Sequence, residues 1–179
     1  MAEEWQRVEP TKVTPVGWRV IVEKTFVQPN GETGVYTTLH PEGGKAACLI
    51  ALTKDNQVVV ARQFRPGPER MMDELPGGAV EENEDPQDAA IRELKEETGY
   101  VPGNVEFLGQ SSRDAYSNAV WYYYFATDCE LSGDGQDLDN NEYVDVKLIS
   151  IGQLIINAKT DQLSDPVAVF YALDKLTKR

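Results

Sequence analysis

The chain has 179 residues, of which 41% are hydrophobic and 26% charged, and its formal net charge is −13. This composition is that of an ordinary globular protein, and the length suits one domain with a sizeable hydrophobic core. The acidic balance excludes sequence-independent binding to DNA or RNA phosphates, which needs a basic surface. The overall field also repels anions, so an anionic substrate would depend on a metal ion or on local arginines.

The first ten residues, MAEEWQRVEP, lack the basic segment and the apolar core of a secretory signal. No apolar run approaches the roughly 18–20 residues that a membrane-spanning helix needs. The two cysteines, Cys48 and Cys129, make no CxxC motif and no disulfide framework, so we expect free buried thiols. These features predict a cytoplasmic protein.

An antiparallel hairpin is expected ahead of the main fold. Residues 16–27 alternate apolar and polar side chains as a strand does, Pro29-Asn30-Gly31 is a turn signal, and residues 33–40 return as a second strand. The single histidine, His40, stands before Pro41, which favours a surface loop over a metal or catalytic site. We therefore expect an N-terminal extension over about residues 1–43.

Two apolar strands follow the hairpin. Residues 45–53 are an almost continuous apolar run, typical of a central strand, and residues 57–64 return as the next strand. That strand ends in Arg62-Gln63-Phe64-Arg65, just before a Pro-Gly loop. Solvated surface charge is one interpretation of these arginines. Contact with phosphate is the other, because a planar guanidinium suits bidentate phosphate oxygens.

A helix rich in carboxylates is predicted in the middle of the chain. Asp85 is the expected N-cap, Pro86 the first helical residue and Gly99 the stop. Three glutamates at i, i+3 and i+4 share one face of this helix: Glu93, Glu96 and Glu97. Such a cluster is either a solvated face or a cation site, and Mg²⁺ or Mn²⁺ would relieve its repulsion because both prefer oxygen ligands. The preceding Gly77-Gly78 pair allows close backbone approach, which could add a carbonyl ligand.

The remaining elements complete an α/β pattern. Strands are expected at residues 104–110, 119–127 and 142–149, and helices at 150–157 and 167–175. The acidic segment 131–141 resembles a calcium loop, but Glu142 stands where an EF-hand needs glycine, and the closing glutamate is missing. Interleaved strands and helices favour a mixed sheet with helices on both faces, in a single domain over residues 1–179.

The acid cluster belongs to a longer pattern over residues 78–100. It consists of Gly78, five residues, Glu84, seven residues, Arg92-Glu93-Leu94, one residue, Glu96-Glu97, one residue and Gly99-Tyr100. Every defined position matches the Nudix box, which is a long and specific motif, so the chain resembles the Nudix hydrolases. The resemblance implies an α/β/α sandwich and Mg²⁺-dependent cleavage of a nucleoside diphosphate linked to another moiety.

Roles can be assigned to residues in and around the box. Three carboxylates are the expected metal ligands and catalytic acids: Glu93, Glu96 and Glu97. Arg92, on the same helix, is expected to orient a carboxylate by ion pairing. The resemblance implies that the Gly77 carbonyl completes the metal shell and that Glu142 is a further ligand or the general base.

The flanking segments are similar to the ADP-ribose pyrophosphatase, or nucleoside-diphosphate-sugar, branch of the family. They are the hairpin, the arginine segment, Glu74-Leu75-Pro76-Gly77-Gly78 and the loop at Glu142. This similarity implies that Arg65 contacts the substrate with Ala79 beside it, and that ADP-ribose would give AMP and ribose 5-phosphate. It also implies a homodimer through the N-terminal region.

The segment after the box departs from that branch. Where the branch often has Ser-Pro-Gly-aromatic-Ser-x-Glu, residues 113–119 read RDAYSNA, and only the aromatic and the following serine remain. A tyrosine in this neighbourhood, here Tyr116, is associated with dinucleoside polyphosphate hydrolases, which is the alternative activity. A Nudix regulator that binds nucleotide without turnover is a third hypothesis, and the intact set of box acids disfavours it.

Overall fold

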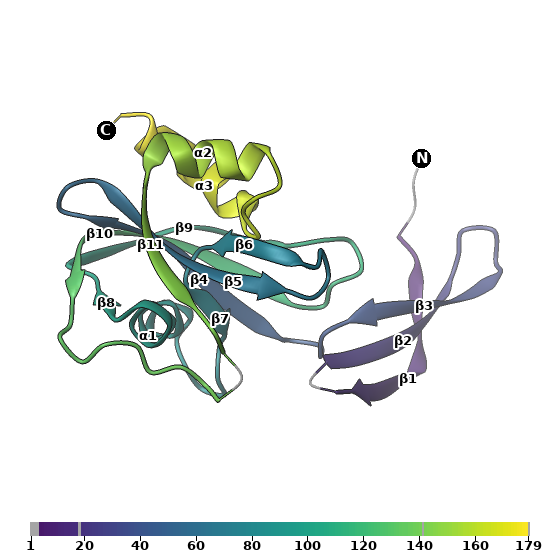
Figure 1. Ribbon diagram of the computed structural model, residues 1–179. Helices are drawn as coiled ribbons and strands as arrows, with labels where there is room; N and C mark the ends of the chain where they lie inside the picture. The colour runs from purple at the N-terminus through teal and green to yellow at the C-terminus, as the bar shows by residue number, and fades with distance from the viewer. Residues whose placement is uncertain (1–3, 18, 141, 179) are drawn as a thin grey trace. The chain divides into compact units, whose positions relative to one another are not determined.

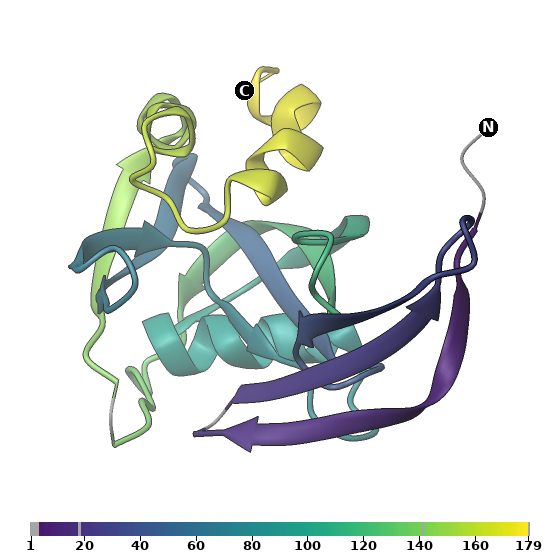
Figure 2. The ribbon, with the colours of Figure 1, turned by 90° about the vertical axis from the view of Figure 1, so that its right-hand side faces the viewer.

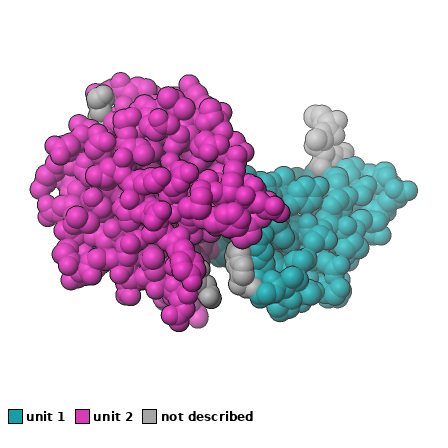
Figure 3. All heavy atoms as spheres, in the orientation of Figure 1, with its two compact units in different colours: residues 1–44, 112–120 teal, residues 45–111, 121–179 magenta. Residues whose placement is uncertain are grey.

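A computed structural model describes residues 4–17, 19–140 and 142–178. Their elements, in chain order, are β1 (Gln6–Val16), β2 (Arg19–Val27), β3 (Thr33–Leu39), β4 (Lys45–Thr53), β5 (Gln57–Arg65), β6 (Arg70–Glu74), β7 (Gly77–Ala79), α1 (Pro86–Thr98), β8 (Tyr100–Val101), β9 (Asn104–Ser112), β10 (Val120–Leu131), β11 (Asp145–Ser150), α2 (Ile151–Lys159) and α3 (Pro166–Leu176) (Figure 1; Figure 2). The chain divides into two compact units, residues 1–44 with 112–120 and residues 45–111 with 121–179 (Figure 3). Whether they behave as the single domain expected over residues 1–179 stays a prediction.

Within the described residues, the first unit contains a three-stranded antiparallel sheet in the order β1-β2-β3. The predicted hairpin is β2 and β3, and its turn is closed by the Gly31 N–H, which donates to the Gln28 carbonyl at 2.9 Å. β1 has no counterpart among the predicted strands, because most of its side chains are exposed and Pro10 lies within a register shift between Val8 and Lys12. The strand expected at residues 16–27 instead spans the end of β1, a turn and β2, and its residue 18 lies outside the described residues.

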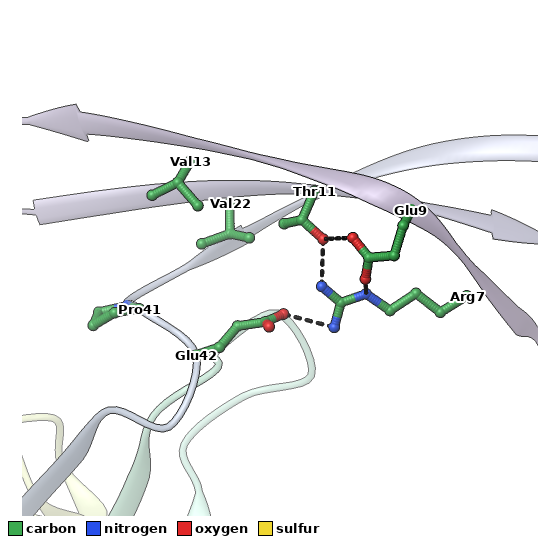
Figure 4. A pocket seen from close by; sticks show the side chains of 7 residues that line it. All are labelled: Arg7, Glu9, Thr11, Val13, Val22, Pro41 and Glu42. Carbon is green, nitrogen blue, oxygen red and sulfur yellow. Dashed lines mark hydrogen bonds and ion pairs between the residues drawn. The ribbon is translucent and has the colours of Figure 1, made fainter.

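A small cavity of about 300 Å³ lies in this unit beside β1 and β2 (Figure 4). The Arg7 guanidinium crosses it and is paired with Glu42 at 2.8 Å and with Glu9 at 3.2 Å. Val13 and Val22 form its apolar side (Figure 4). Its charged groups are therefore already bonded to one another.

Residues 112–120 belong to the same unit because they bond to the end of β3. The Leu39 N–H donates to the Tyr116 carbonyl at 2.8 Å, and the Asn118 N–H donates to the Leu39 carbonyl at 2.9 Å. The Asn118 amide group donates to the His40 carbonyl at 2.8 Å and accepts from the Lys24 ammonium at 2.5 Å. These bonds fix the backbone of the segment and leave the side chain of Tyr116 56% exposed.

The second unit contains, in the described part of the chain, an eight-stranded sheet that follows the path β11-β5-β4-β10-β8. β6 pairs with β5, β7 with β4, and β9 with β10. Alternate residues of β4 pack into different layers: Cys48, Ile50 and Leu52 join a core with α2 and α3, whereas Ala47, Leu49 and Ala51 join a core with α1. Helices thus cover both faces (Figure 1), and the predicted α/β/α sandwich is confirmed.

The helix signals read from the sequence match the structure closely. The Asp85 carboxylate accepts from the Gln87 N–H at 2.8 Å, and Gly99 ends α1 in the left-handed region with φ 73°. Ser150 caps α2 by accepting from the Gln153 N–H at 3.1 Å. The last strand begins later than expected, at Asp145, because residues 142–144 are still part of the preceding loop. No helix in the described ranges combines the length and the apolarity needed to cross a membrane.

Candidate active site

The site is built where one face of α1 meets the short glycine strand β7. Ala89, Ala90 and Leu94 are fully buried and anchor α1 against the sheet. The Gly77 N–H donates to the Glu97 carboxylate at 3.1 Å. The carboxylates of α1 are therefore held against the sheet and do not form a solvated helix face.

Two adjacent glycines allow this close approach, for different reasons. A Cβ added at Gly77 would lie 2.6 Å from the Cα of Cys48, which is backbone of the neighbouring strand β4. A Cβ added at Gly78 would lie 2.6 Å from Cδ of Glu93, which is the end of a flexible side chain. Gly77 therefore serves the pairing of β7 with β4, and Gly78 serves the position of the Glu93 carboxylate.

Arg92 links the carboxylates around the glycine strand. Its Nε donates to Glu84 at 2.9 Å, and its Nη1 donates to Glu93 at 2.9 Å and to Glu96 at 2.8 Å. Its Nη2 donates to the Ala79 carbonyl at 3.1 Å. The bonds to the three glutamates raise the pKa of Arg92, the bond to Glu84 first, and Arg92 in turn lowers the pKa of Glu84. The expected ion pairing of Arg92 with box carboxylates is present.

Glu97 is a buried carboxyl group, only 6% exposed. Burial raises its pKa to about 8, and the negative charges of Glu93, Glu74 and Glu142 act in the same direction, while the bond from Gly77 opposes them. Burial also raises the pKa of Glu93, although Arg92 opposes that shift. The site therefore concentrates more negative charge than its own protein groups neutralise.

The oxygen donors gathered here suit a hard divalent cation, which would supply the missing positive charge. Among the described residues, however, no three acidic, cysteine or histidine side chains form a preformed metal cage. The carboxylates are bonded to protein groups instead: Glu93 and Glu96 to Arg92, and Glu142 to the Asp139 N–H at 3.2 Å.

The loop before β11 brings Glu142 to this site. The Gln136 side chain donates to the Glu97 carbonyl at 2.6 Å, and the Asp137 N–H donates to the Glu96 carbonyl at 2.9 Å. These bonds hold the loop along the end of α1. Glu142, although exposed, lies near enough for its charge to act on the pKa of Glu97 and of Glu93.

Two further buried carboxylates, Glu74 and Asp73, were not among the residues predicted for the site. Glu74 is 6% exposed and is bonded in two-pronged fashion by Arg65, while Asp73 is 5% exposed and pairs with Arg62 at 3.0 Å. Side chains of a strand alternate between faces, so the two pairs lie on opposite sides of the sheet. The Glu74 charge is among the causes that raise the pKa of Glu97. The signal available in the sequence was the odd, three-residue spacing of the two arginines on β5 together with two consecutive acids on β6, since both spacings place one member on each face of the sheet.

The predicted substrate residues fall in both units. Arg65 and Ala79 lie in the second unit with the glutamate cluster, whereas Tyr116 lies in the first unit, on the segment bonded to β3. Each residue is thus placed within its own unit by the contacts described above.

Within this α/β/α sandwich, the glutamates of α1 pack on a glycine strand and gather oxygen donors of the kind that divalent cations prefer. The NUDIX domain family matches residues 43–170, so the chain belongs to the Nudix family. It is a Nudix pyrophosphohydrolase similar to the ADP-ribose pyrophosphatases.

Several known proteins resemble the chain over most of its length. It is 30% identical over 142 residues to a methanol dehydrogenase activator of Bacillus methanolicus, covering 79% of this chain and 76% of that one. It is 27% identical over 124 residues to an ADP-ribose pyrophosphatase of Bacillus subtilis, covering 69% of this chain and 66% of that one. The crystal structure of an ADP compounds hydrolase has the same fold, with a TM-score of 0.81 at 18% identity over 99% of this chain and 97% of that one.

The two glycines give a first prediction. Gly78→Ala should fold with little loss of stability but lose most pyrophosphohydrolase activity, because the new methyl displaces the flexible Glu93 carboxylate. Gly77→Ala should lower the free energy of unfolding by about 1–3 kcal/mol or more, because its methyl meets strand backbone. Urea unfolding and steady-state assays would measure both, and full activity of Gly78→Ala would contradict this account of the site.

The buried Glu97 gives a prediction about pH. Its pKa is about 8 in the folded chain against an ordinary value of 4.5, so the stability associated with its protonated form is present below about pH 4.5. That stability is lost as the pH rises through about 8. In EDTA, the free energy of unfolding should therefore fall less steeply with pH in Glu97→Gln than in the native chain, since an amide does not ionise. Identical pH dependences in urea unfolding would argue against the burial of an ionisable group here.

Proposed function

We propose that the chain hydrolyses the pyrophosphate bond of ADP-ribose or a related nucleoside diphosphate sugar with the help of Mg²⁺, giving a nucleoside monophosphate and a sugar phosphate. The observation that carries the proposal is the convergence of Glu93, the buried Glu97 and the charge of Glu142 beside Gly77. A cluster with excess negative charge suits a divalent cation and, through it, an anionic pyrophosphate.

Five groups would hold Mg²⁺, or Mn²⁺ in its place: the Gly77 carbonyl and the carboxylates of Glu93, Glu96, Glu97 and Glu142. When bound, the ion would neutralise pyrophosphate oxygens and make a water molecule a stronger nucleophile. Arg92 would keep the Glu93 and Glu96 carboxylates oriented, since it already bonds both. Glu142 is exposed on its loop, which suits a general base that must accept a proton from water.

Recognition of the substrate is assigned to groups outside the box. The Arg65 guanidinium, 44% exposed, would bind phosphate oxygens, and Ala79, at the end of β7, would lie beside the substrate. The names of the Bacillus subtilis ADP-ribose pyrophosphatase and of a mouse ADP-sugar pyrophosphatase, 35% identical over 92 residues, support a sugar-linked ADP.

Hydrolysis of dinucleoside polyphosphates is the second candidate. The observation in its favour is Tyr116, whose exposed ring stands on a segment that lacks the proline, glycine and glutamate expected for an ADP-ribose enzyme. An exposed aromatic ring can stack on a second base. This candidate leaves the metal site unchanged.

We also propose that the chain forms a homodimer through its N-terminal region. The three-stranded sheet exposes apolar side chains for which a partner surface would provide burial, such as Val13 at 60% and Val35 at 66%. The size of the particle in solution, measured by light scattering, tests this assignment.

Removing the charge of Glu97 tests the reaction. Glu97→Gln should lower kcat by about three orders of magnitude, equivalent to ~4 kcal/mol of activation free energy, because metal charge is lost from the transition state. The fold should persist, since the Gln carbonyl can still accept from Gly77. Leu173→Ala, a change at an exposed position of α3, serves as a control that should retain wild-type turnover. Undiminished turnover by Glu97→Gln would remove the basis of the proposal.

A substrate panel separates the two candidates. ADP-ribose, ADP-glucose, GDP-mannose and diadenosine polyphosphates would each be assayed with Mg²⁺ and again after chelation by EDTA. We expect the highest kcat/KM for ADP-ribose or another sugar-linked diphosphate, and no turnover after chelation. Preference for a diadenosine polyphosphate would replace the first candidate by the second.

A further inference from the structure

We propose that Glu74 is a positioning residue of this enzyme, which holds the Arg65 guanidinium so that one edge of it is presented to a substrate phosphate. This inference rests on the proposed function, because that function assigns Arg65 to the substrate. Glu74 itself need not touch the substrate.

The bonds of Arg65 leave part of its guanidinium available. Nε and Nη2 donate to the two carboxylate oxygens of Glu74, which occupies one edge of the planar group. Among the residues that the structure describes, Arg65 makes no other side-chain hydrogen bond, so none of these residues accepts from its Nη1. Its side chain is 44% exposed. The Nη1 donors can therefore reach a ligand while Glu74 retains its two bonds.

Glu74 is a firm anchor for this arrangement. It ends β6, is 6% exposed, and also accepts from the side chain of the buried Gln63 at 3.3 Å. A buried carboxylate without a partner is costly, which favours the conformation in which Arg65 is bonded. The long arginine side chain is thereby ordered before any ligand arrives, which removes an entropic cost from binding.

The anchored guanidinium lies beside the glutamate cluster. Glu74 makes the largest contribution to the raised pKa of Arg65, and the charges of Glu97 and Glu142 contribute less strongly in the same direction. Arg65, Gln63 and Val59 alternate along β5, and Val59 packs in the core formed with α1. The arginine therefore belongs to the face of the sheet that carries the candidate site.

The neighbouring residue Asp73 provides a matched control. It is equally buried, at 5%, and it also pairs with an arginine of β5, Arg62. Its other partner is Asn157 of α2, at 2.8 Å, on the opposite face of the sheet. Loss of its charge should thus disturb a buried pair of the same kind without affecting Arg65.

The experiment compares Glu74→Gln with Asp73→Asn in steady-state hydrolysis, using the substrate that the native chain turns over best. We expect Glu74→Gln to raise KM about tenfold and to change kcat less than threefold, because the guanidinium loses its fixed orientation while the metal ligands remain. Asp73→Asn should leave KM unchanged. A native KM for Glu74→Gln, or an equal rise for Asp73→Asn, would overturn the inference.

A double-mutant cycle shows whether Glu74 acts through Arg65. In an Arg65→Ala background, Glu74→Gln should raise KM no further, whereas an undiminished additional effect would contradict the positioning role.

Arg65→Lys, at a partly exposed position, provides a second test should Glu74→Gln fail to fold. It keeps the charge but not the two-pronged bond, so it should also raise KM about tenfold, and a native KM would count against the inference.

The inference and the proposed function can fail separately. If the native chain hydrolyses no member of the panel, the proposed function fails. If it hydrolyses one and the variants behave as native, only the positioning role fails.

Calorimetric titration with ADP adds a measurement of binding without turnover, in which Glu74→Gln should weaken binding about tenfold and Asp73→Asn should not. Equal affinities for ADP in both variants would overturn the role of Glu74.

Discussion

The contact between the glutamate face of α1 and the glycine strand β7 is the constraint on which the second unit depends. Glu97 is buried there against the Gly77 N–H, and Gly78 leaves room for the Glu93 carboxylate. A helix face with this much negative charge would ordinarily point into water. Its burial is maintained because apolar side chains adjacent to the glutamates on α1 are fully buried in the core, and because Arg92 bonds several of the carboxylates at once.

This arrangement explains why a site with excess negative charge can persist in a protein that is itself acidic. The apolar core formed by β4, β5 and α1 fixes the backbone independently of the charges. Glu97 is then held in a buried position, where burial and, after it, the charges of neighbouring carboxylates raise its pKa. The carboxylates of the site are incompletely neutralised by protein groups. A divalent cation, which carries two charges and prefers oxygen ligands, would neutralise them better than a protein side chain.

Two arginine–acid pairs join β5 to β6, one on each face of the sheet. Arg62 and Asp73 join α2 to the sheet through Asn157, which is a structural connection. Arg65 and Glu74 lie on the other face, next to the glutamate cluster, where part of the guanidinium stays exposed. The two arginine–acid pairs therefore lie in different surroundings, because strand side chains alternate between the two faces of the sheet.

The sequence by itself determined the α/β class, the limits of α1 and the identity of the box acids, because caps, periodicity and motif spacing are local properties of the chain. Asp85, through its side-chain cap, and Gly99, through its left-handed backbone, mark their helix ends without a tertiary partner. The strand β1 and the pairing of Arg65 with Glu74 were decided only by the tertiary structure. β1 lacks an alternating pattern because most of its side chains are exposed, and its pairing with β2 is what identifies it. The environment of Glu74 is set by its burial and by its bond from Arg65 on another strand. Neither follows from the residues that adjoin Glu74 in the sequence.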